Sequence, residues 1–321
     1  MKNCAIGIDL GGTKIAFGTV DEHGRLLDLL RCDTQTQGGF DAVTKQVAGG
    51  IGQLVGRCVP PPVGIGIGVA GQVHPETGAV VFAPNLDWHD VPLRIEVERE
   101  CAMPVTVTND VRAALWGEWL FGAGRGARDL ICIFVGTGIG GGIVCGGKVL
   151  EGFSNTAGEI GHMTVDIRGP LCTCGNRGCM EALASGWAMT RRAQDSVRAD
   201  PVLGGAVLKI AGGKIEDITA KTLVQAYYAA DALATEIIDD AADALAAGVA
   251  ALVNALNPGR IILGGGIIEG MPEMVSRIDK GVRGRALRAA TARLTIEPSK
   301  LGNRAGIIGA AALAMKAVSS D

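Results

Sequence analysis

Residues 6–15 read Ile-Gly-Ile-Asp-Leu-Gly-Gly-Thr-Lys-Ile. The mostly apolar run 6–10 is followed by a glycine pair, and a second apolar run begins at Ile15. Apolar runs rich in Ile and Val and bounded by Gly are typical of β-hairpins. The same shape returns at residues 131–135, Ile-Cys-Ile-Phe-Val, which the glycine-rich segment 136–142 joins to a further apolar run at 143–149. We therefore predict two strand–hairpin–strand units, placed about half a chain apart.

A second, looser pair of segments supports this repeat. Residues 63–71 and 260–270 are both apolar runs that end in small residues. Internal similarity at a fixed spacing indicates a duplicated structural unit. Strands that alternate with helical segments favour an α/β fold. The sequence therefore predicts two similar α/β halves.

Further elements are expected around the two hairpins. Asn109 and Asp110 offer a helix start, because Asn and Asp are good capping residues, and Pro258 stops the Ala-rich helix before it. The final helix is expected to fold back on the first half, and residues 160–180 are expected to be a loop-rich insertion. The expected strands are 4–10, 15–20, 25–32, 63–69 and 105–108, and the expected helices are 41–57, 91–100, 110–121, 231–256 and 305–318.

The composition is that of a folded globular protein. Of 321 residues, 48% are hydrophobic and 20% are charged, and the net charge of −3 argues against a general nucleic-acid-binding surface. The length suits two domains. No apolar window is long enough for a secretory signal or a membrane span. Nine cysteines, an odd number, do not suggest a secreted disulfide framework, so we expect a cytoplasmic protein.

A group of metal-ligand residues is the most specific local signal. Imidazole and thiolates are zinc ligands, and four of them in a tetrahedral array make a closed, structural site. A catalytic zinc keeps one position open, and a redox pair needs a Cys-x-x-Cys spacing, which this segment lacks. We predict a structural zinc site. Its ligands are His162, Cys172, Cys174 and Cys179.

Glycine turns after apolar strands suggest phosphate binding, since backbone amides can converge on phosphates, and Asp9 can hold a hydrated Mg²⁺. Residues 136–141 satisfy a dinucleotide fingerprint, but a strand follows them where a helix is required. No Gly-x4-Gly-Lys-Ser/Thr loop occurs. A strand–hairpin–strand phosphate clamp remains. The assigned residues are Asp9, Gly11, Gly12, Thr13, Lys14, Gly136, Thr137, Gly138, Gly264, Gly265 and Gly266.

Another polar group suits a polyhydroxylated ligand. Asp110 stands at a strand-to-helix junction, where a carboxylate is held rigidly, although an isolated Asp there also reads as a simple helix cap. Asn85 lies in a Pro-Asn-Leu turn, Glu159 lies three residues before His162, and Glu181 follows the cysteine cluster. Together these side chains supply the donors and acceptors that the hydroxyl groups of such a ligand require.

On these residues the chain resembles the ROK family of sugar kinases and related regulators. The matching segments cover the chain from its first strand to its last helix. They are residues 9–14 (Asp-Leu-Gly-Gly-Thr-Lys), 109–113 (Asn-Asp-x-x-Ala), 135–138 (Val-Gly-Thr-Gly), 158–162 (Gly-Glu-Ile-Gly-His) and 172–181 (Cys-Thr-Cys-Gly-Asn-Arg-Gly-Cys-Met-Glu).

The resemblance implies a duplicated, actin-like fold of the ribonuclease-H type, with a sugar cleft between two domains. The first domain would comprise residues 1–118 and 303–321, and the second, with the zinc loop, residues 119–302. Asp110 would be the base that takes the proton of the sugar 6-hydroxyl. One nitrogen of His162 would bind zinc and the other the sugar. The remaining sugar contacts implied are Gly71, Asn85, Asn109, Glu159 and Glu181.

The resemblance leaves the substrate open. It favours ATP-dependent phosphorylation of glucose, and the alternatives are N-acetylglucosamine or N-acetylmannosamine as substrate and polyphosphate as donor. A sugar-sensing repressor would carry a helix-turn-helix segment before the first hairpin, whereas here the first strand is expected to start by Cys4. A binding protein without catalysis is a third reading. The resemblance also implies homodimers or homotetramers.

Overall fold

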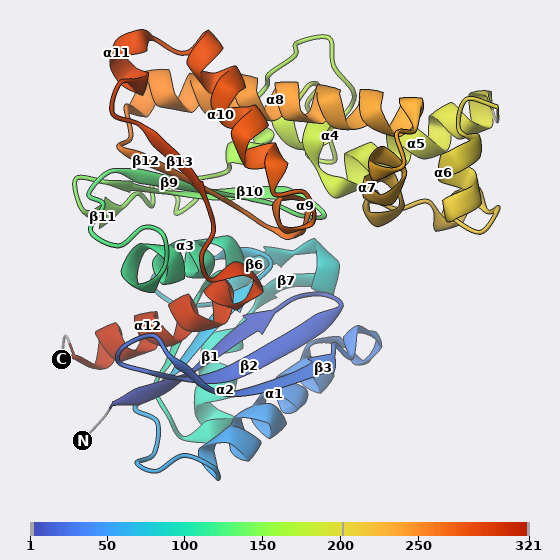
Figure 1. Ribbon diagram of the computed structural model, residues 1–321. Helices are drawn as coiled ribbons and strands as arrows, with labels where there is room; N and C mark the ends of the chain where they lie inside the picture. Colours follow the sequence, from blue (N-terminus) through green and yellow to red (C-terminus); the bar gives the residue numbers. More distant parts are fainter. Residues whose placement is uncertain (1–2, 201, 320–321) are drawn as a thin grey trace. The chain divides into compact units, whose positions relative to one another are not determined.

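The computed structural model describes residues 3–200 and 202–319, which form two compact units (Figure 1). Unit 1 takes the chain up to residue 126, residues 151–157 and the chain from residue 300. Unit 2 takes residues 127–150 and 158–299. Compared with the expected first domain, residues 1–118 and 303–321, unit 1 also includes residues 119–126, 151–157 and 300–302.

Unit 1 is built on a five-stranded sheet with the order β3-β2-β1-β4-β8. Strands β1 and β4 are parallel, as are β4 and β8, whereas β2 and β3 form antiparallel hairpins with their neighbours. A small sheet, β5-β6-β7, follows β4. The strands are β1 Cys4–Leu10, β2 Lys14–Asp21, β3 Leu26–Asp33, β4 Ile65–Val69, β5 Gln72–Val73, β6 Val80–Ala83, β7 Trp88–Val91 and β8 Val105–Asn109, and the helices are α1 Gly39–Val55, α2 Leu93–Cys101, α3 Asp110–Phe121 and α12 Ala305–Ser319.

The two faces of this sheet bury different side chains. Successive residues of a strand face opposite sides, so Ile6, Ile8 and Leu10 of β1 join the apolar core under α1 and α2. The opposite face of β1 carries small residues, and α12 lies against it. A side chain at Gly7 would overlap the backbone carbonyl of Ile307 in α12. The last helix therefore docks on the first strand, as predicted, and glycine makes the close approach possible.

Unit 2 repeats the arrangement with the sheet order β11-β10-β9-β12-β13. Strand by strand the pairings match those of unit 1: β9 and β10 are antiparallel, and β9, β12 and β13 are parallel. The predicted duplication is confirmed. The strands are β9 Leu130–Val135, β10 Ile139–Cys145, β11 Lys148–Val149, β12 Arg260–Gly264 and β13 Thr295–Pro298.

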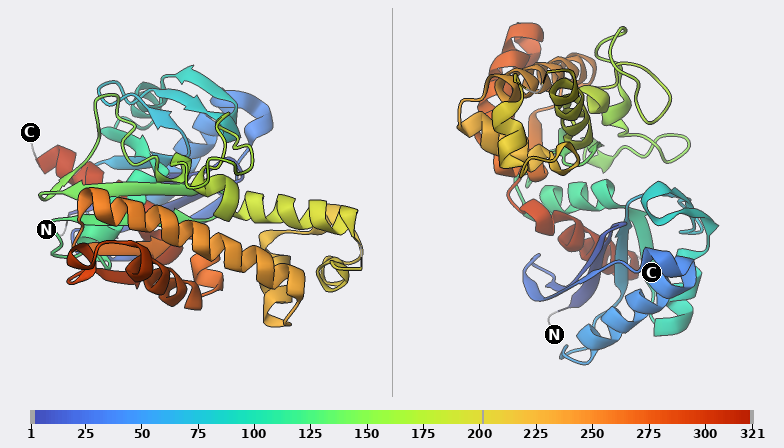
Figure 2. Two further views of the ribbon diagram at one scale, coloured as in Figure 1. Left: turned by 90° about the horizontal axis from the view of Figure 1, so that it is seen from above. Right: turned by 90° about the vertical axis from the view of Figure 1, so that its right-hand side faces the viewer.

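The helices of unit 2 form its largest apolar core with the sheet. Helices α8 and α10 lie side by side along the sheet (Figure 1 and Figure 2), and Leu245 and Val249 of α8 join Ile131 and Ile261 in the core. The helices are α4 Met180–Ala184, α5 Gly186–Ala199, α6 Gly205–Ile210, α7 Ala220–Tyr228, α8 Ala232–Leu256, α9 Gly266–Gly270, α10 Glu273–Arg285 and α11 Arg288–Thr291.

One predicted turn was too long. The second hairpin was expected to turn over residues 136–142, but β10 already begins at Ile139, and Gly140, Gly141 and Gly142 pair with β9. Glycine occurs in the strand because a side chain at Gly141 would overlap that of Ile160. The sequence interpretation also missed β5, β6 and β7, whose segments of two to four residues are too short to carry a clear alternation.

No helix among the described residues has the length and apolar character needed to cross a membrane. The longest, α8, carries acidic residues along its course.

Candidate functional site

The first glycine turn connects β1 to β2 and is held by its neighbours. The amide of Gly11 donates to the carbonyl of Lys14 at 3.1 Å, and the hydroxyl of Thr34 donates to the carbonyl of Gly11 at 2.7 Å. A side chain at Gly12 would overlap Asn85, so this turn lies directly against the Pro-Asn-Leu turn. Thr13 and Lys14 are exposed. The turn expected to bind phosphate therefore lies against Asn85, which is expected to contact the sugar.

Asp9 is the residue of β1 that precedes this turn, and its environment is unusual for a carboxylate. It lies next to Gly306 at the start of α12. Burial, and then the charge of Asp110, raise the pKa of Asp9 from 3.8 to about 6, against the opposing effect of Arg31. A buried carboxylate whose negative charge is so little balanced by nearby positive charge is a suitable ligand for a hydrated cation.

Asn109 and Asp110 lie where β8 ends and α3 begins. The sequence left open whether Asp110 is only a helix cap. The structure assigns the cap to Asn109, whose Oδ1 accepts the amide of Arg112 at 3.1 Å. The Nδ2 of Asn109 donates to the carbonyl of Gly71 at 3.2 Å. Asn109 therefore joins the helix start to Gly71, and the adjacent Asp110 does not serve as the cap.

The predicted metal ligands converge in unit 2. The four donor atoms, one from each side chain, all lie within 4.8 Å of one another. The Sγ atoms of Cys174 and Cys179 are 3.7 Å apart, and Cys172 Sγ is 3.7 Å from His162 Nδ1. A tetrahedral site with Zn–S bonds of about 2.3 Å has ligand atoms about 3.8 Å apart. The side chains present therefore fit a zinc ion.

The environments of the three thiols differ. Burial and hydrogen bonds with Cys174 and Cys172 raise the pKa of Cys179 to about 12. The pKa of Cys174 is lowered, chiefly by a hydrogen bond from the backbone at Asn176. Since zinc binds thiolates, metal uptake by this cluster would release protons.

His162 presents its two ring nitrogens to different neighbours. Nδ1 lies 3.7 Å from Sγ of Cys172 in the candidate metal site, whereas Nε2 lies 4.0 Å from Oε2 of Glu159. Glu159 is more than half exposed, and about a third of the His162 side chain is exposed. A metal ion bound through Nδ1 would thus fix the direction of Nε2.

Glu181 links the metal loop to the second hairpin. It lies in the first turn of α4, two residues after Cys179. Its Oε2 accepts the amide of Ile139 at 2.8 Å, and its Oε1 accepts from Nε1 of Trp187 at 3.4 Å. A side chain at Gly138 would overlap this carboxylate. The expected sugar contact Glu181 therefore also holds the turn between β9 and β10.

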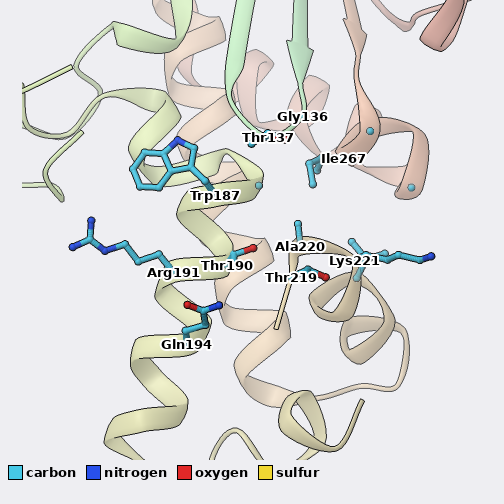
Figure 3. A pocket seen from close by; sticks show the side chains of 14 residues that line it. Gly136, Thr137, Trp187, Thr190, Arg191, Gln194, Thr219, Ala220, Lys221 and Ile267 are labelled. Carbon is cyan, nitrogen blue, oxygen red and sulfur yellow. The ribbon is translucent and has the colours of Figure 1, made fainter. Parts of the chain in front are cut away.

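The second hairpin opens onto a cavity of about 730 Å³ (Figure 3). In Figure 3, Gly136, Thr137 and Ile267 line one side, the first turn of α7 the opposite side, and α5 a third. The start of α5 is tied to the hairpin, because the amide of Gly186 donates to the carbonyl of Gly136 at 2.9 Å. The cavity residues from α5 are Gly186, Trp187, Thr190, Arg191 and Gln194, and those from α7 and its N-cap are Thr219, Ala220, Lys221 and Val224.

The cavity wall formed by α5 and α7 was not predicted from the sequence. Its helix starts carry recognisable signals: Ser185 caps α5, and Thr219 with Thr222 forms a capping box at α7. These signals mark where helices begin, but not which faces meet the hairpin.

The third glycine turn has mixed roles. Gly266 lines the cavity together with Gly136 and Thr137. Gly264 lines a different hollow of unit 2, and a side chain there would crowd Phe134 and Ser299. Gly265 has a φ of 91° and packs on the backbone of Val135. Of these three glycines, Gly266 is therefore the one that borders the cavity.

The expected site residues are divided between the units. Unit 1 carries Asp9, Gly11, Gly12, Thr13, Lys14, Gly71, Asn85, Asn109 and Asp110, and unit 2 carries Gly136, Thr137, Gly138, Glu159, His162, Cys172, Cys174, Cys179, Glu181, Gly264, Gly265 and Gly266.

Comparison with known proteins places these features in a family context. A sequence model of the ROK family matches residues 5–317. The chain is 38% identical to a glucokinase of Streptomyces coelicolor over 312 residues, 96% of each chain, and 37% identical to a glucokinase of Thermotoga maritima over 309 residues, again 96% of each. It is also similar to the crystal structure of a ROK family glucokinase from Streptomyces griseus in complex with glucose and AMPPNP. The TM-score is 0.85 at 36% identity, covering 98% of this chain and 100% of that one.

Proposed function

The chain belongs to the ROK family and has the duplicated, actin-like α/β fold predicted from its sequence, and on this premise we propose that it is an ATP-dependent hexose kinase. We propose glucose as the substrate and its 6-hydroxyl as the acceptor. The observation that carries the proposal is the similarity, over nearly the whole of both chains, to a glucokinase crystallised with glucose and a nucleotide analogue.

Asp110 is the proposed general base. A base takes the hydroxyl proton as the oxygen attacks the γ-phosphorus, a contribution of about 10²- to 10⁴-fold in rate. The cap role of Asn109 supports this, because it explains the helix start without Asp110. Alignment of the hydroxyl with the phosphate supplies a further part of the rate, roughly 7 kcal/mol or more.

The proposed sugar contacts come from both units. In unit 1 they are Asn85, Asn109 and the backbone at Gly71, and the bond from Asn109 to Gly71 supports a shared role. In unit 2 they are Glu159, Glu181 and His162, which would bind a hydroxyl through Nε2. Carboxylates and amides oriented in this way suit sugar hydroxyls, which both donate and accept.

The proposed nucleotide contacts are the two hairpins and the cavity beside the second one. Amides of residues 11–14 and 136–138 would face the phosphates, and Gly266 with the walls from α5 and α7 would hold the adenosine half. The cavity volume, about 730 Å³, is within the usual range for a site of this kind. Phosphoryl transfer needs positive charge beside the negatively charged phosphate oxygens, and Mg²⁺ held near Asp9 would supply it.

Zinc has a structural role in this proposal. One histidine and three thiols fill a tetrahedral shell and leave no position for substrate. The ion would hold His162 in place and fasten the loop that leads into Glu181.

A coupled ADP-release assay tests the proposal over glucose, mannose, fructose, allose, N-acetylglucosamine and N-acetylmannosamine, with ATP or polyphosphate as the donor. We expect the highest kcat/KM with glucose and ATP. Asp110→Asn should lower kcat about 10²- to 10⁴-fold while calorimetry still detects sugar binding, whereas the exposed-residue control Asp41→Asn should be active. An acetamido sugar preferred over glucose would reassign the substrate. Sugar binding without turnover would favour a regulator or another non-catalytic sugar-binding protein.

A further inference from the structure

Residues 151–157 form a short loop whose assignment is unexpected. The residues on both sides of it belong to unit 2, yet the loop itself belongs to unit 1. Its ends are joined, since the amide of Ala157 donates to the carbonyl of Glu151 at 3.0 Å, and Gly152 and Gly158 at its borders have φ values of 74° and 100°. The loop leads directly into Glu159.

Asn155 attaches this loop to unit 1 through all of its polar side-chain atoms. Its Nδ2 donates to the carbonyl of Val73 in β5 at 2.8 Å, and its Oδ1 accepts from Nη1 of Arg112. Nη2 of Arg112 donates to the backbone carbonyl of Asn155 at 2.9 Å. Asn155 has a φ of 60°, a left-handed conformation that asparagine tolerates better than most residues.

These bonds close a ring around the start of α3. Asn109 binds the carbonyl of Gly71, and Asn155 binds that of Val73, two residues further along the same segment. Arg112 then connects Asn155 back to the first turn of α3. In the sequence, Asp110 lies between Asn109 at the end of β8 and Arg112 in the first turn of α3, which are both members of the ring. A forked, charge-assisted contact of this kind sets direction as well as distance.

We propose that Arg112 and Asn155 form a clasp that fixes residues 151–157 on unit 1, and that this clasp orients the chain leading through Gly158 into Glu159. The inference rests on the proposed function, because it assigns Glu159 and Asp110 to the sugar. Arg112 is then a positioning residue. It sets affinity for the hexose and not for the nucleotide, since no clasp residue lines the cavity beside the second hairpin.

Steady-state kinetics of Arg112→Ala, Asn155→Ala and the double variant test the clasp. We expect each single variant to raise the KM for the hexose about tenfold, the effect of losing a charge-assisted hydrogen bond, with the KM for ATP changed less than about twofold. The double variant should be no worse than either single variant, because each one already opens the clasp. Arg112→Lys should behave like Arg112→Ala, since lysine lacks the fork.

Two controls are available on the same unit. Ser154→Ala removes a hydroxyl that contacts Thr156 within the loop, and Arg99→Ala removes an exposed arginine paired with Glu96 on α2. Both should keep the wild-type KM values. Effects of Arg112→Ala and Asn155→Ala that multiply in the double variant would overturn the clasp, as would a silent Asn155→Ala or full activity in Arg112→Lys.

Amide hydrogen exchange, measured on the substrate-free protein, tests the clasp independently of the proposed kinase activity. Arg112→Ala and Asn155→Ala should speed exchange of the Ala157 amide at least about tenfold, while Ser154→Ala should not. Unchanged exchange overturns the clasp even if the wild type phosphorylates a hexose. If both variants exchange faster but the wild-type protein phosphorylates no sugar, the clasp is supported as an anchor of the loop. The kinase assignment is then refuted instead.

Discussion

Nδ1 of His162 lies 3.7 Å from Sγ of Cys172, which leaves Nε2 of the same ring facing the exposed Glu159. The imidazole thus belongs to the candidate metal site on one edge and to the candidate sugar site on the other. Because metal binding at one nitrogen restricts the orientation of the ring, the three cysteine ligands should influence sugar affinity without touching the sugar.

Loss of the metal should therefore weaken sugar binding. We expect about one zinc ion per chain by elemental analysis and a loss of most of it in Cys174→Ser. The KM for the hexose should rise about 10- to 100-fold in that variant, with a smaller change in the KM for ATP. Cys145→Ser is the matched control, because Cys145 is an exposed thiol of β10 outside the cluster. A zinc-free variant with an unchanged KM for the hexose would separate the metal from the sugar site.

The ionised form of Asp9 should lower the stability of the folded protein at pH values above the pKa of Asp9. The pKa of Asp9 is about 6 in the folded chain against 3.8 ordinarily, so the folded state holds more protons between these values. Stability from this group is therefore greatest at low pH and declines as the pH rises through about 6. In metal-free buffer, Asp9→Asn should raise Tm by about 2–4 °C at pH 7.5 and leave it unchanged near pH 4, while activity is lost.

Thermal scans from pH 4 to pH 8 check this prediction. Asp28→Asn is a control of opposite sign, since the pKa of Asp28 is lowered, first by its hydrogen bond to Arg57, and its substitution should not raise Tm. A gain for Asp9→Asn of equal size at both ends of the pH range would contradict the assignment to titration.

Glu118 should be a main determinant of the stability of unit 1. It is fully buried in α3, and its carboxylate accepts the amides of Ala123, Lys300 and Leu301 at 2.8, 3.2 and 2.7 Å. These amides lie near the points where the chain leaves and re-enters unit 1. Glu118→Ala therefore removes the acceptor of three backbone N–H groups at these two points. We expect a loss of at least about 3 kcal/mol in urea unfolding, which fluorescence of the neighbouring Trp116 and Trp119 can follow.

The surface residue Glu96, paired with Arg99, gives the comparison for Glu118. Glu96→Ala should change the free energy of unfolding by less than about 1 kcal/mol. Similar losses in the two variants would mean that the amide contacts of Glu118 contribute little.

Filling the cavity beside the second hairpin should affect the nucleotide alone. Ala220 lines the cavity from the first turn of α7, and Ala220→Phe should raise the KM for ATP about tenfold or more through steric exclusion. The KM for the hexose should stay unchanged. Ala229→Phe, at the exposed end of the same helix, is the control. An unchanged KM for ATP would show that the adenosine half does not bind in this cavity.

Local sequence predicted much of this molecule. The two hairpins, the long helix α8, the return of α12 to unit 1 and the grouping of the four metal ligands were all expected, and the structure contains them. Each depends on residues close in sequence or on a repeated pattern. Apolar runs with glycine turns specify hairpins, and four ligands within about twenty residues can meet by local folding alone.

Contacts between distant segments required the tertiary structure. Nothing in the sequence around Arg112 indicates that it binds Asn155, and nothing around Glu118 indicates that it holds Lys300 and Leu301. The cavity wall from α5 and α7 and the electrostatic link between Asp9 and Asp110 are of the same kind. Periodicity and turn residues describe neighbours along the chain. The partners of a buried charge or an amide are chosen only when the sheet orders its strands and the helices pack upon it.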